Sequence, residues 1–184
     1  MAWRVSRGWA GGILLAVVAA LGCLDSPPAS VDPGQSDAMG NSGDCPQVCD
    51  SCGDDGTCII DCDEDNCEEP IFCPPGRPCQ VTCTGYAACE NTPIDCLDAT
   101  SCLIRCTGHD ACQDGIRCGG SSCSVTCDGA QACSDSGVEC LADSCEIGCY
   151  GESACESGVC CDGVECGTMC TSVDGGCCRC VGCA

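Results

Sequence analysis

The 184-residue chain contains 31 cysteines, one histidine and no lysine, and its 28 acidic residues far outnumber its six basic ones. Aromatic residues make up only 3% of the chain, which excludes an ordinary core of large apolar side chains. Cysteine is far above the roughly 8–10% that marks a disulfide scaffold. Phosphate contacts need clustered Lys and Arg, so we expect no nucleic-acid partner.

Residues 1–22 have the pattern of an export signal. Arg4 and Arg7 precede an unbroken apolar run at 12–21, which is too short to span a bilayer stably. We therefore predict a signal helix that is removed on export.

The end of this segment reads Ala20-Leu21-Gly22-Cys23. It resembles the lipobox of bacterial lipoproteins, although Ala20 stands where that motif usually has Leu. The resemblance implies cleavage before Cys23, acylation of Cys23, and attachment to a membrane through the lipid. The alternative is ordinary secretion with an unmodified Cys23.

A segment rich in Pro, Gly, Ser and Asp follows at 24–44. Such a composition cannot bury apolar surface, so we predict that 23–44 is a disordered, lipid-anchored linker. Setting Cys23 aside also leaves an even number of cysteines, which is what complete pairing requires.

Residues 58–165 contain five repeats of about 22 residues. Each begins with Cys-x-φ-x-Cys, in which φ is aliphatic, and continues through a turn to a third Cys and then to φ-x-Cys. In four repeats the turn reads Gly-x-x-Ala-Cys, as at 85–89 and 108–112. Residues 45–57 precede the repeats as a Cys-rich cap. Residues 166–184 begin a sixth repeat and end in a second Cys-rich cap.

The alternation in Cys-x-φ-x-Cys has the period of a β-strand, with both cysteines and the aliphatic residue on one face. Two short strands and their turns make one coil, and stacked coils bury an interior that one coil cannot bury alone. The fold class is therefore all-β, a small disulfide-rich parallel β-solenoid of about five to six coils. A disulfide-stapled stack with little regular structure is the alternative.

Strand geometry limits how the cysteines pair. Cys79 and Cys83 on one strand lie roughly 13 Å apart at ~3.3 Å per residue, whereas a disulfide needs Cα atoms about 4.4–6.8 Å apart. Each must therefore pair across its coil with a third or fourth Cys, or with a neighbouring coil. The predicted structural disulfide cysteines of the repeats are Cys58, Cys62, Cys67, Cys73, Cys79, Cys83, Cys89, Cys96, Cys102, Cys106, Cys112, Cys118, Cys123, Cys127, Cys133, Cys140, Cys145, Cys149, Cys155 and Cys161.

The residue before the fourth Cys should point outward in every coil. This row reads Phe72, Asp95, Arg117, Glu139 and Cys160, which predicts a ladder of alternating charge. An outward Cys160 should pair outside the repeat pattern, for example with the C-terminal cysteines.

Metal binding is the main alternative use of the cysteines. Cys49-x-x-Cys52, Cys178-x-Cys180 and Cys180-x-x-Cys183 have ligand-like spacing. Metallothioneins, however, use many CxC pairs with abundant Lys, and an exported chain meets conditions in which disulfides persist. We expect disulfides, no cofactor and no redox site at the CxxC motifs.

Two other positions are weaker candidates for a site. Asp61, Asp63 and Asp65 form a weak calcium candidate in an acidic loop, without the EF-hand or nonapeptide pattern. His109 lies in a turn that varies between repeats, which indicates a surface position rather than a catalytic one.

The interior resembles that of the cysteine-rich β-solenoids of some insect antifreeze proteins. Their Thr-x-Thr rows are absent, since the row after φ reads Asp61, Thr82, Arg105, Thr126, Gly148 and Met169. The chain as a whole resembles cysteine-rich repeat lipoproteins of bacterial envelopes, a likeness that implies no defined activity.

We therefore expect no enzyme and no catalytic residues. The expected function is that of an exported or surface-anchored scaffold for adhesion, envelope structure or binding of a protein or glycan. Sequestration of soft metals or calcium is the alternative function, and secretion is the alternative localisation.

Overall fold

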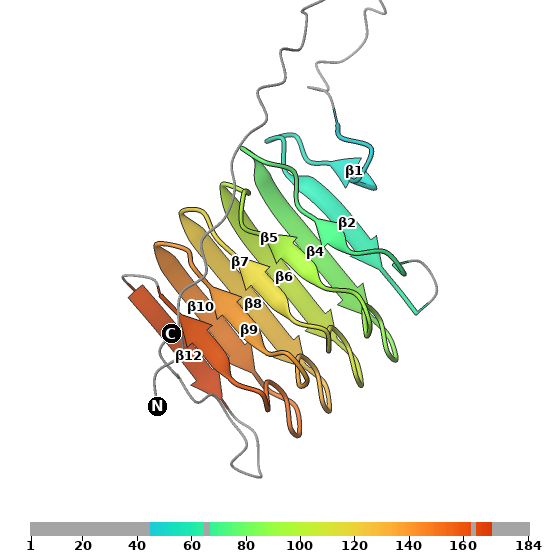
Figure 1. Cartoon of the computed structure of the whole chain (residues 1–184). Coiled ribbons are helices and arrows are strands. Elements are labelled where there is room, and N and C mark those ends of the chain that lie inside the picture. The colour runs from blue at the N-terminus through green and yellow to red at the C-terminus, as the bar shows by residue number, and fades with distance from the viewer. Residues whose placement is uncertain (1–44, 65–66, 163–164, 171–184) are drawn as a thin grey trace, which may run out of the picture. The chain divides into compact units, whose positions relative to one another are not determined.

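The computed structural model describes residues 45–64, 67–162 and 165–170, and its regular elements in these ranges are all strands (Figure 1). No helix among these residues has the length and apolar character needed to cross a membrane. The predicted signal helix, linker and second Cys-rich cap lie outside the described residues.

The longer strands form a seven-stranded sheet in the order β1-β2-β4-β6-β8-β10-β12. All its neighbours pair in parallel except β1, which lies antiparallel to β2 at the N-terminal end. The bounds are β1 Ser51–Cys52, β2 Cys58–Cys62, β4 Pro78–Thr84, β6 Ser101–Thr107, β8 Ser122–Asp128, β10 Ser144–Cys149 and β12 Glu165–Cys170.

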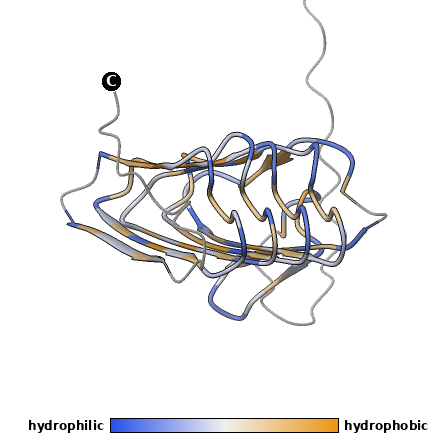
Figure 2. Cartoon of the chain, turned by 90° about the horizontal axis from the view of Figure 1, so that it is seen from below, coloured by the Kyte–Doolittle hydropathy of each residue, from blue (hydrophilic) through white to orange (hydrophobic). Residues whose placement is uncertain are grey.

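The shorter strands form a five-stranded parallel sheet in the order β11-β9-β7-β5-β3. Their bounds are β3 Ile71–Phe72, β5 Ile94–Cys96, β7 Ile116–Cys118, β9 Val138–Cys140 and β11 Val159–Cys161. The two sheets lie as two layers joined by turns at both sides (Figure 2). The predicted parallel β-solenoid is confirmed, with one long and one short strand in each coil.

Register follows the repeat from coil to coil. Cys79 lies opposite Cys102, Val81 opposite Ile104, and Cys83 opposite Cys106. Burial alternates along β4 and β6 as the period-two pattern predicts, with the cysteines and aliphatic residues inside. The core is therefore a set of ladders of identical or similar side chains, one rung per coil.

The aliphatic rungs of both sheets are almost completely buried. In the long sheet they are Ile60, Val81, Ile104, Val125 and Ile147, and in the short sheet Ile71, Ile94, Ile116, Val138 and Val159. The alanine of each Gly-x-x-Ala-Cys turn joins them, since Ala88, Ala111, Ala132 and Ala154 have no exposed surface. Small and β-branched side chains suit this interior because the disulfides already occupy much of it.

Close approach between coils explains the repeated turn glycine. A Cβ on Gly129 would collide with the backbone carbonyl of Gly108, and a Cβ on Gly151 with that of Gly129. Only a residue without Cβ lets these turns stack at strand spacing. The glycines are thus required by contact between coils, in addition to their role within a turn.

Candidate functional site

The first set of disulfides closes the wide turn of each coil. The second Cys of a repeat, at the end of the long strand, bonds the third Cys in the turn. These pairs are Cys62–Cys67, Cys83–Cys89, Cys106–Cys112, Cys127–Cys133 and Cys149–Cys155. Of the arrangements that strand geometry left open, the wide turns use pairing within one repeat.

The third Cys of the four Gly-x-x-Ala-Cys turns has left-handed backbone geometry, with φ of 55° or 56° at Cys89, Cys112, Cys133 and Cys155. A non-glycine residue pays roughly 1–2 kcal/mol for this conformation. The backbone here directs Sγ toward the end of the long strand, and the disulfide holds it there. Each of these four turns is therefore a covalently closed unit with a left-handed cysteine at its end.

The second set of disulfides closes the narrow corner between coils. The fourth Cys of one repeat bonds the first Cys of the next. These pairs are Cys73–Cys79, Cys118–Cys123, Cys140–Cys145 and Cys161–Cys166. As predicted, Cys79 and Cys83 do not bond each other.

The N-terminal cap uses its cysteines in the same way. Cys45 bonds Cys52, and Cys49 bonds Cys58 at the start of β2. Cys49 and Cys52 therefore belong to two different disulfides, and their CxxC spacing does not make a redox pair. Cys178, Cys180 and Cys183 lie outside the described residues.

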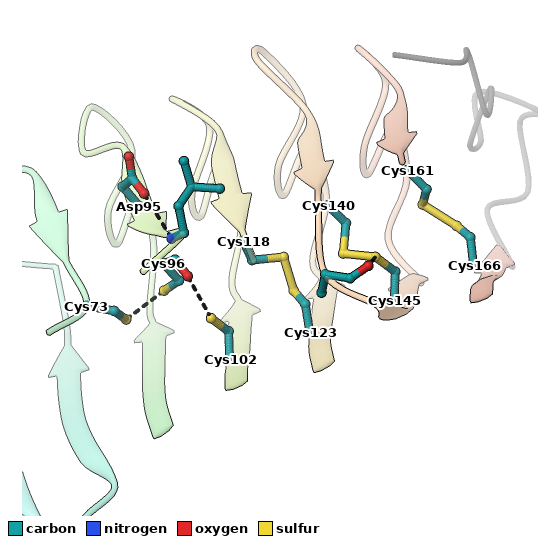
Figure 3. Close-up of a disulfide and its surroundings, with 12 residues drawn as sticks. Cys73, Asp95, Cys96, Cys102, Cys118, Cys123, Cys140, Cys145, Cys161 and Cys166 are labelled. Carbon is teal, nitrogen blue, oxygen red and sulfur yellow. Dashed lines mark hydrogen bonds between the residues drawn. A yellow bond between two sulfur atoms is a disulfide. The ribbon is translucent and has the colours of Figure 1, made fainter. Parts of the chain in front are cut away.

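One corner departs from the pattern, and there the prediction was wrong. Cys96 and Cys102 were expected to be disulfide-bonded, but both are buried free thiols (Figure 3). Cys96 Sγ lies 2.6 Å from Cys73 Sγ of the preceding coil. Cys102 Sγ lies 3.2 Å from the carbonyl oxygen of Cys96. The chain spacing matches that of Cys73–Cys79, so the direction of the Cys96 side chain, toward the preceding coil, accounts for the difference.

The two free thiols have opposite pKa perturbations. A hydrogen bond between them raises the pKa of Cys96, and burial raises it further. The same hydrogen bond lowers the pKa of Cys102, against the opposing effect of burial. Cys102 is therefore the first of the pair to lose its proton.

All the other repeat cysteines predicted as structural are disulfide-bonded. Cys160 is also disulfide-bonded. Cys23, the predicted lipidation residue, lies outside the described residues. Cys45, Cys49, Cys52 and Cys166 also form disulfides. They were not among the predicted bridging residues, although their place next to the first and last repeats was a usable signal.

The outer face of the short sheet carries the predicted charge ladder. Arg117 Nε donates to Glu139 Oε2 at 2.8 Å, and Arg117 Nη1 to Asp95 Oδ2 at 3.4 Å. The hydrogen bond and the charge of Glu139 raise the pKa of Arg117. A groove of about 350 Å³ lies along this face between exposed Phe72 and Glu139. The alternating charges span three coils.

His109 lies at the wide-turn edge, where its ring stacks on that of Tyr86 with centroids 5.4 Å apart. Its Nδ1 lies 2.7 Å from Asp110 Oδ2. Within the described part of the chain, no serine or cysteine side chain hydrogen-bonds the imidazole. The geometry gives His109 an ordinary surface stacking position, as the variable turn predicted.

The acidic loop holds the calcium candidates only in part. Asp61 and Asp63 are exposed, and Asp65 lies outside the described residues. The backbone amide of Asp61 donates to Asp50 Oδ2 at 2.8 Å. This bond uses one carboxylate oxygen of Asp50 to fix β2 against the N-terminal cap, a structural role for one acidic residue near the candidate site.

Comparison of the chain with protein-family models, with curated proteins and with solved structures finds no significant match. The geometry of the chain itself therefore carries the functional argument.

Proposed function

We propose that this protein is an exported, non-enzymatic scaffold that is displayed on a membrane through a lipid on Cys23. One observation carries the proposal: coil after coil is closed by its own disulfides while the outward side chains stay in register. Disulfides of this density suit an oxidising extracellular environment. Such a body has a defined outer surface without depending on a large apolar core.

The outer surface supports a binding role rather than a chemical one. Along the long sheet, parallel register places Thr82, Arg105 and Thr126 in one row, and on the short sheet it aligns Asp95, Arg117 and Glu139. Rows of this kind present repeated polar contacts at strand spacing to an extended protein or glycan. We include a protein or glycan partner in this proposal. Adhesion and envelope structure are the roles that such a surface would serve.

Soft-metal sequestration fits the geometry less well. Thiolate sites for zinc use up to four free cysteines. Within the described part of the chain, Cys96 and Cys102 are the cysteines without a disulfide. The remaining sulfur clusters, such as Cys62, Cys83 and Cys89, contain disulfide-bonded atoms.

The anchor is tested by expressing the full chain in a bacterial host that processes lipoproteins. Cys23→Ser is compared with the wild type and with Cys45→Ser, a matched control that also loses one N-terminal cysteine. We expect the wild type and the control to fractionate with membranes and to carry a diacylglycerol-sized mass, whereas Cys23→Ser is not lipidated. A wild-type protein without lipid, or a membrane-bound Cys23→Ser protein, contradicts the anchor.

The scaffold is tested by trypsin digestion under native conditions. Arg105 and Arg117 are exposed, but each lies in a strand that pairs with a neighbour on both sides. We expect no cleavage at either residue in the oxidised protein and rapid cleavage at both after reduction and alkylation. Cleavage of the oxidised protein at a similar rate contradicts a rigid solenoid.

A further inference from the structure

Two successive corners, one between the first and second repeats and one between the second and third, bring four cysteines together. Cys73 and Cys79 form a disulfide, and Cys96 and Cys102 are free thiols. At the other described corners, the corresponding cysteines are consumed in Cys118–Cys123, Cys140–Cys145 and Cys161–Cys166 (Figure 3). Among the described corners, only the one between the second and third repeats holds free thiols, and Cys96 there lies next to the Cys73–Cys79 disulfide.

Parallel pairing produces the contact between the two coils. Ile71 lies opposite Ile94 and Phe72 opposite Asp95. Cys73 directly follows β3 and Cys96 is the last residue of β5, so the two cysteines occupy equivalent places in successive coils. The amide of Cys73 donates to the carbonyl oxygen of Asp95 at 2.9 Å, which fixes the two backbones. Neighbouring strands lie about 4.8 Å apart, within the Cα range of about 4.4–6.8 Å that a disulfide accepts. A bond between Cys73 and Cys96 therefore requires no movement of the sheet.

The sulfur atoms are already positioned for such a bond. Cys96 Sγ lies 2.6 Å from Cys73 Sγ, because the Cys96 side chain points toward the preceding coil. Cys96 and Cys102 are 0% and 5% exposed, so solvent oxidants reach them poorly. Burial thus explains how two thiols persist in an exported protein.

We propose that Cys73, Cys79, Cys96 and Cys102 form a thiol–disulfide exchange site that alternates between a corner disulfide and a disulfide joining two coils. This activity goes beyond the proposed scaffold function and does not depend on membrane anchoring. Its substrate is the protein's own Cys73–Cys79 disulfide.

The exchange balances without an outside oxidant or reductant. The Cys96 sulfur attacks Cys73 Sγ, and the Cys96 proton passes to the sulfur that leaves. The new Cys73–Cys96 bond forms, the Cys73–Cys79 bond breaks, and Cys79 leaves as a thiolate that then accepts the proton. One disulfide and two thiols are present before and after the step.

The disulfide that the exchange forms joins a different kind of position from the wide-turn and corner disulfides. The wide-turn disulfides act within a repeat, and a corner disulfide joins cysteines five or six residues apart in the chain. A Cys73–Cys96 bond instead joins equivalent positions of two successive coils, across the direction in which the coils stack. The exchange therefore adds a covalent link along the solenoid at one point.

The proposal is tested by mapping thiols in full-length protein purified without reductant. The sample is quenched in acid to stop exchange, alkylated with N-ethylmaleimide in denaturant at mildly acidic pH, and digested at acidic residues. Cleavage at Asp98 separates Cys96 from Cys102, and cleavage at Glu90 separates Cys96 from Cys79. We expect label on Cys102 in every molecule and a second label shared between Cys79 and Cys96. No label on these cysteines, or label confined to Cys96 and Cys102, overturns the proposal.

A variant gives a second, independent readout. In Cys79→Ser, the proposed site predicts a Cys73–Cys96 disulfide with label on Cys102. A Cys96–Cys102 disulfide with label on Cys73 overturns it. Cys145→Ser is the matched control at a corner without free thiols, and there we expect label on Cys140. If a variant fails to fold, the map of labelled thiols in the wild-type protein still decides the test.

Discussion

Replacing Gly129 by alanine tests the stacking of the wide turns. A Cβ at this position meets the backbone oxygen, carbon and nitrogen of Gly108 in the preceding coil, which cannot move aside as a flexible side chain can. Gly129 is not among the residues with positive φ, so the substitution carries no conformational penalty of its own. The expected loss of stability therefore comes from contact between coils alone.

The magnitude follows from the atoms displaced. Overpacking costs about 1–3 kcal/mol. Separating the turns also weakens ladder bonds such as Gly108 N to Asp128 O at 3.2 Å and Asp110 N to Ala130 O at 3.0 Å, each worth about 1 kcal/mol. We expect Gly129→Ala to lower the free energy of unfolding by about 3–5 kcal/mol.

Guanidinium-induced unfolding with disulfides intact, followed by far-UV circular dichroism, measures this loss. At a slope of about 4 kcal/mol per molar guanidinium, the midpoint falls by about 1 M. Gly167→Ala is the matched control, because its Cβ would meet only Cys145 O at 3.8 Å, an ordinary contact. If both variants unfold at the wild-type midpoint, the reasoning about close turns is refuted.

Three further predictions concern the core, a disulfide and an acidic turn. Ile104 is completely buried, so Ile104→Ala should cost about 2–5 kcal/mol in the same unfolding assay, and a loss below about 1 kcal/mol contradicts a tightly packed interior. Replacing both Cys127 and Cys133 by alanine opens a loop with a sequence separation of 6, for which chain entropy predicts a loss of about 2 kcal/mol; a neutral effect argues against that account. Hydrogen bonds from Thr57 lower the pKa of Asp55, so this carboxylate stabilises the fold above its unfolded pKa and loses that effect as pH falls through its folded pKa. Asp55→Asn should therefore flatten the acid side of the stability profile between the two pKa values, and an unchanged profile is the opposing result.

The repeat pattern alone was sufficient to predict the architecture. Alternation in Cys-x-φ-x-Cys places side chains on opposite faces of a strand whatever its neighbours are, so inward Val81 and outward Thr82 were predictable. The recurring cysteine and aliphatic positions set neighbouring coils in register although the repeats differ slightly in length, and for this reason the ladder of Asp95, Arg117 and Glu139 could be predicted from residue identity. A Cys79–Cys83 bond could be excluded because the rise per residue of a strand places these two cysteines too far apart.

Disulfide pairing was decided only by the tertiary structure, because cysteines are chemically identical and several partners lay within reach. The direction of each Cβ at a turn selects the partner, as the left-handed backbone of Cys89 does for Cys83. The same cause separates Cys96 from Cys102, whose side chains do not converge although Cys73 and Cys79 bond at the same spacing. Likewise, the need for Gly129 arises from a carbonyl in the preceding coil. Such contacts depend on how coils stack in space, and no local sequence pattern contains that distance.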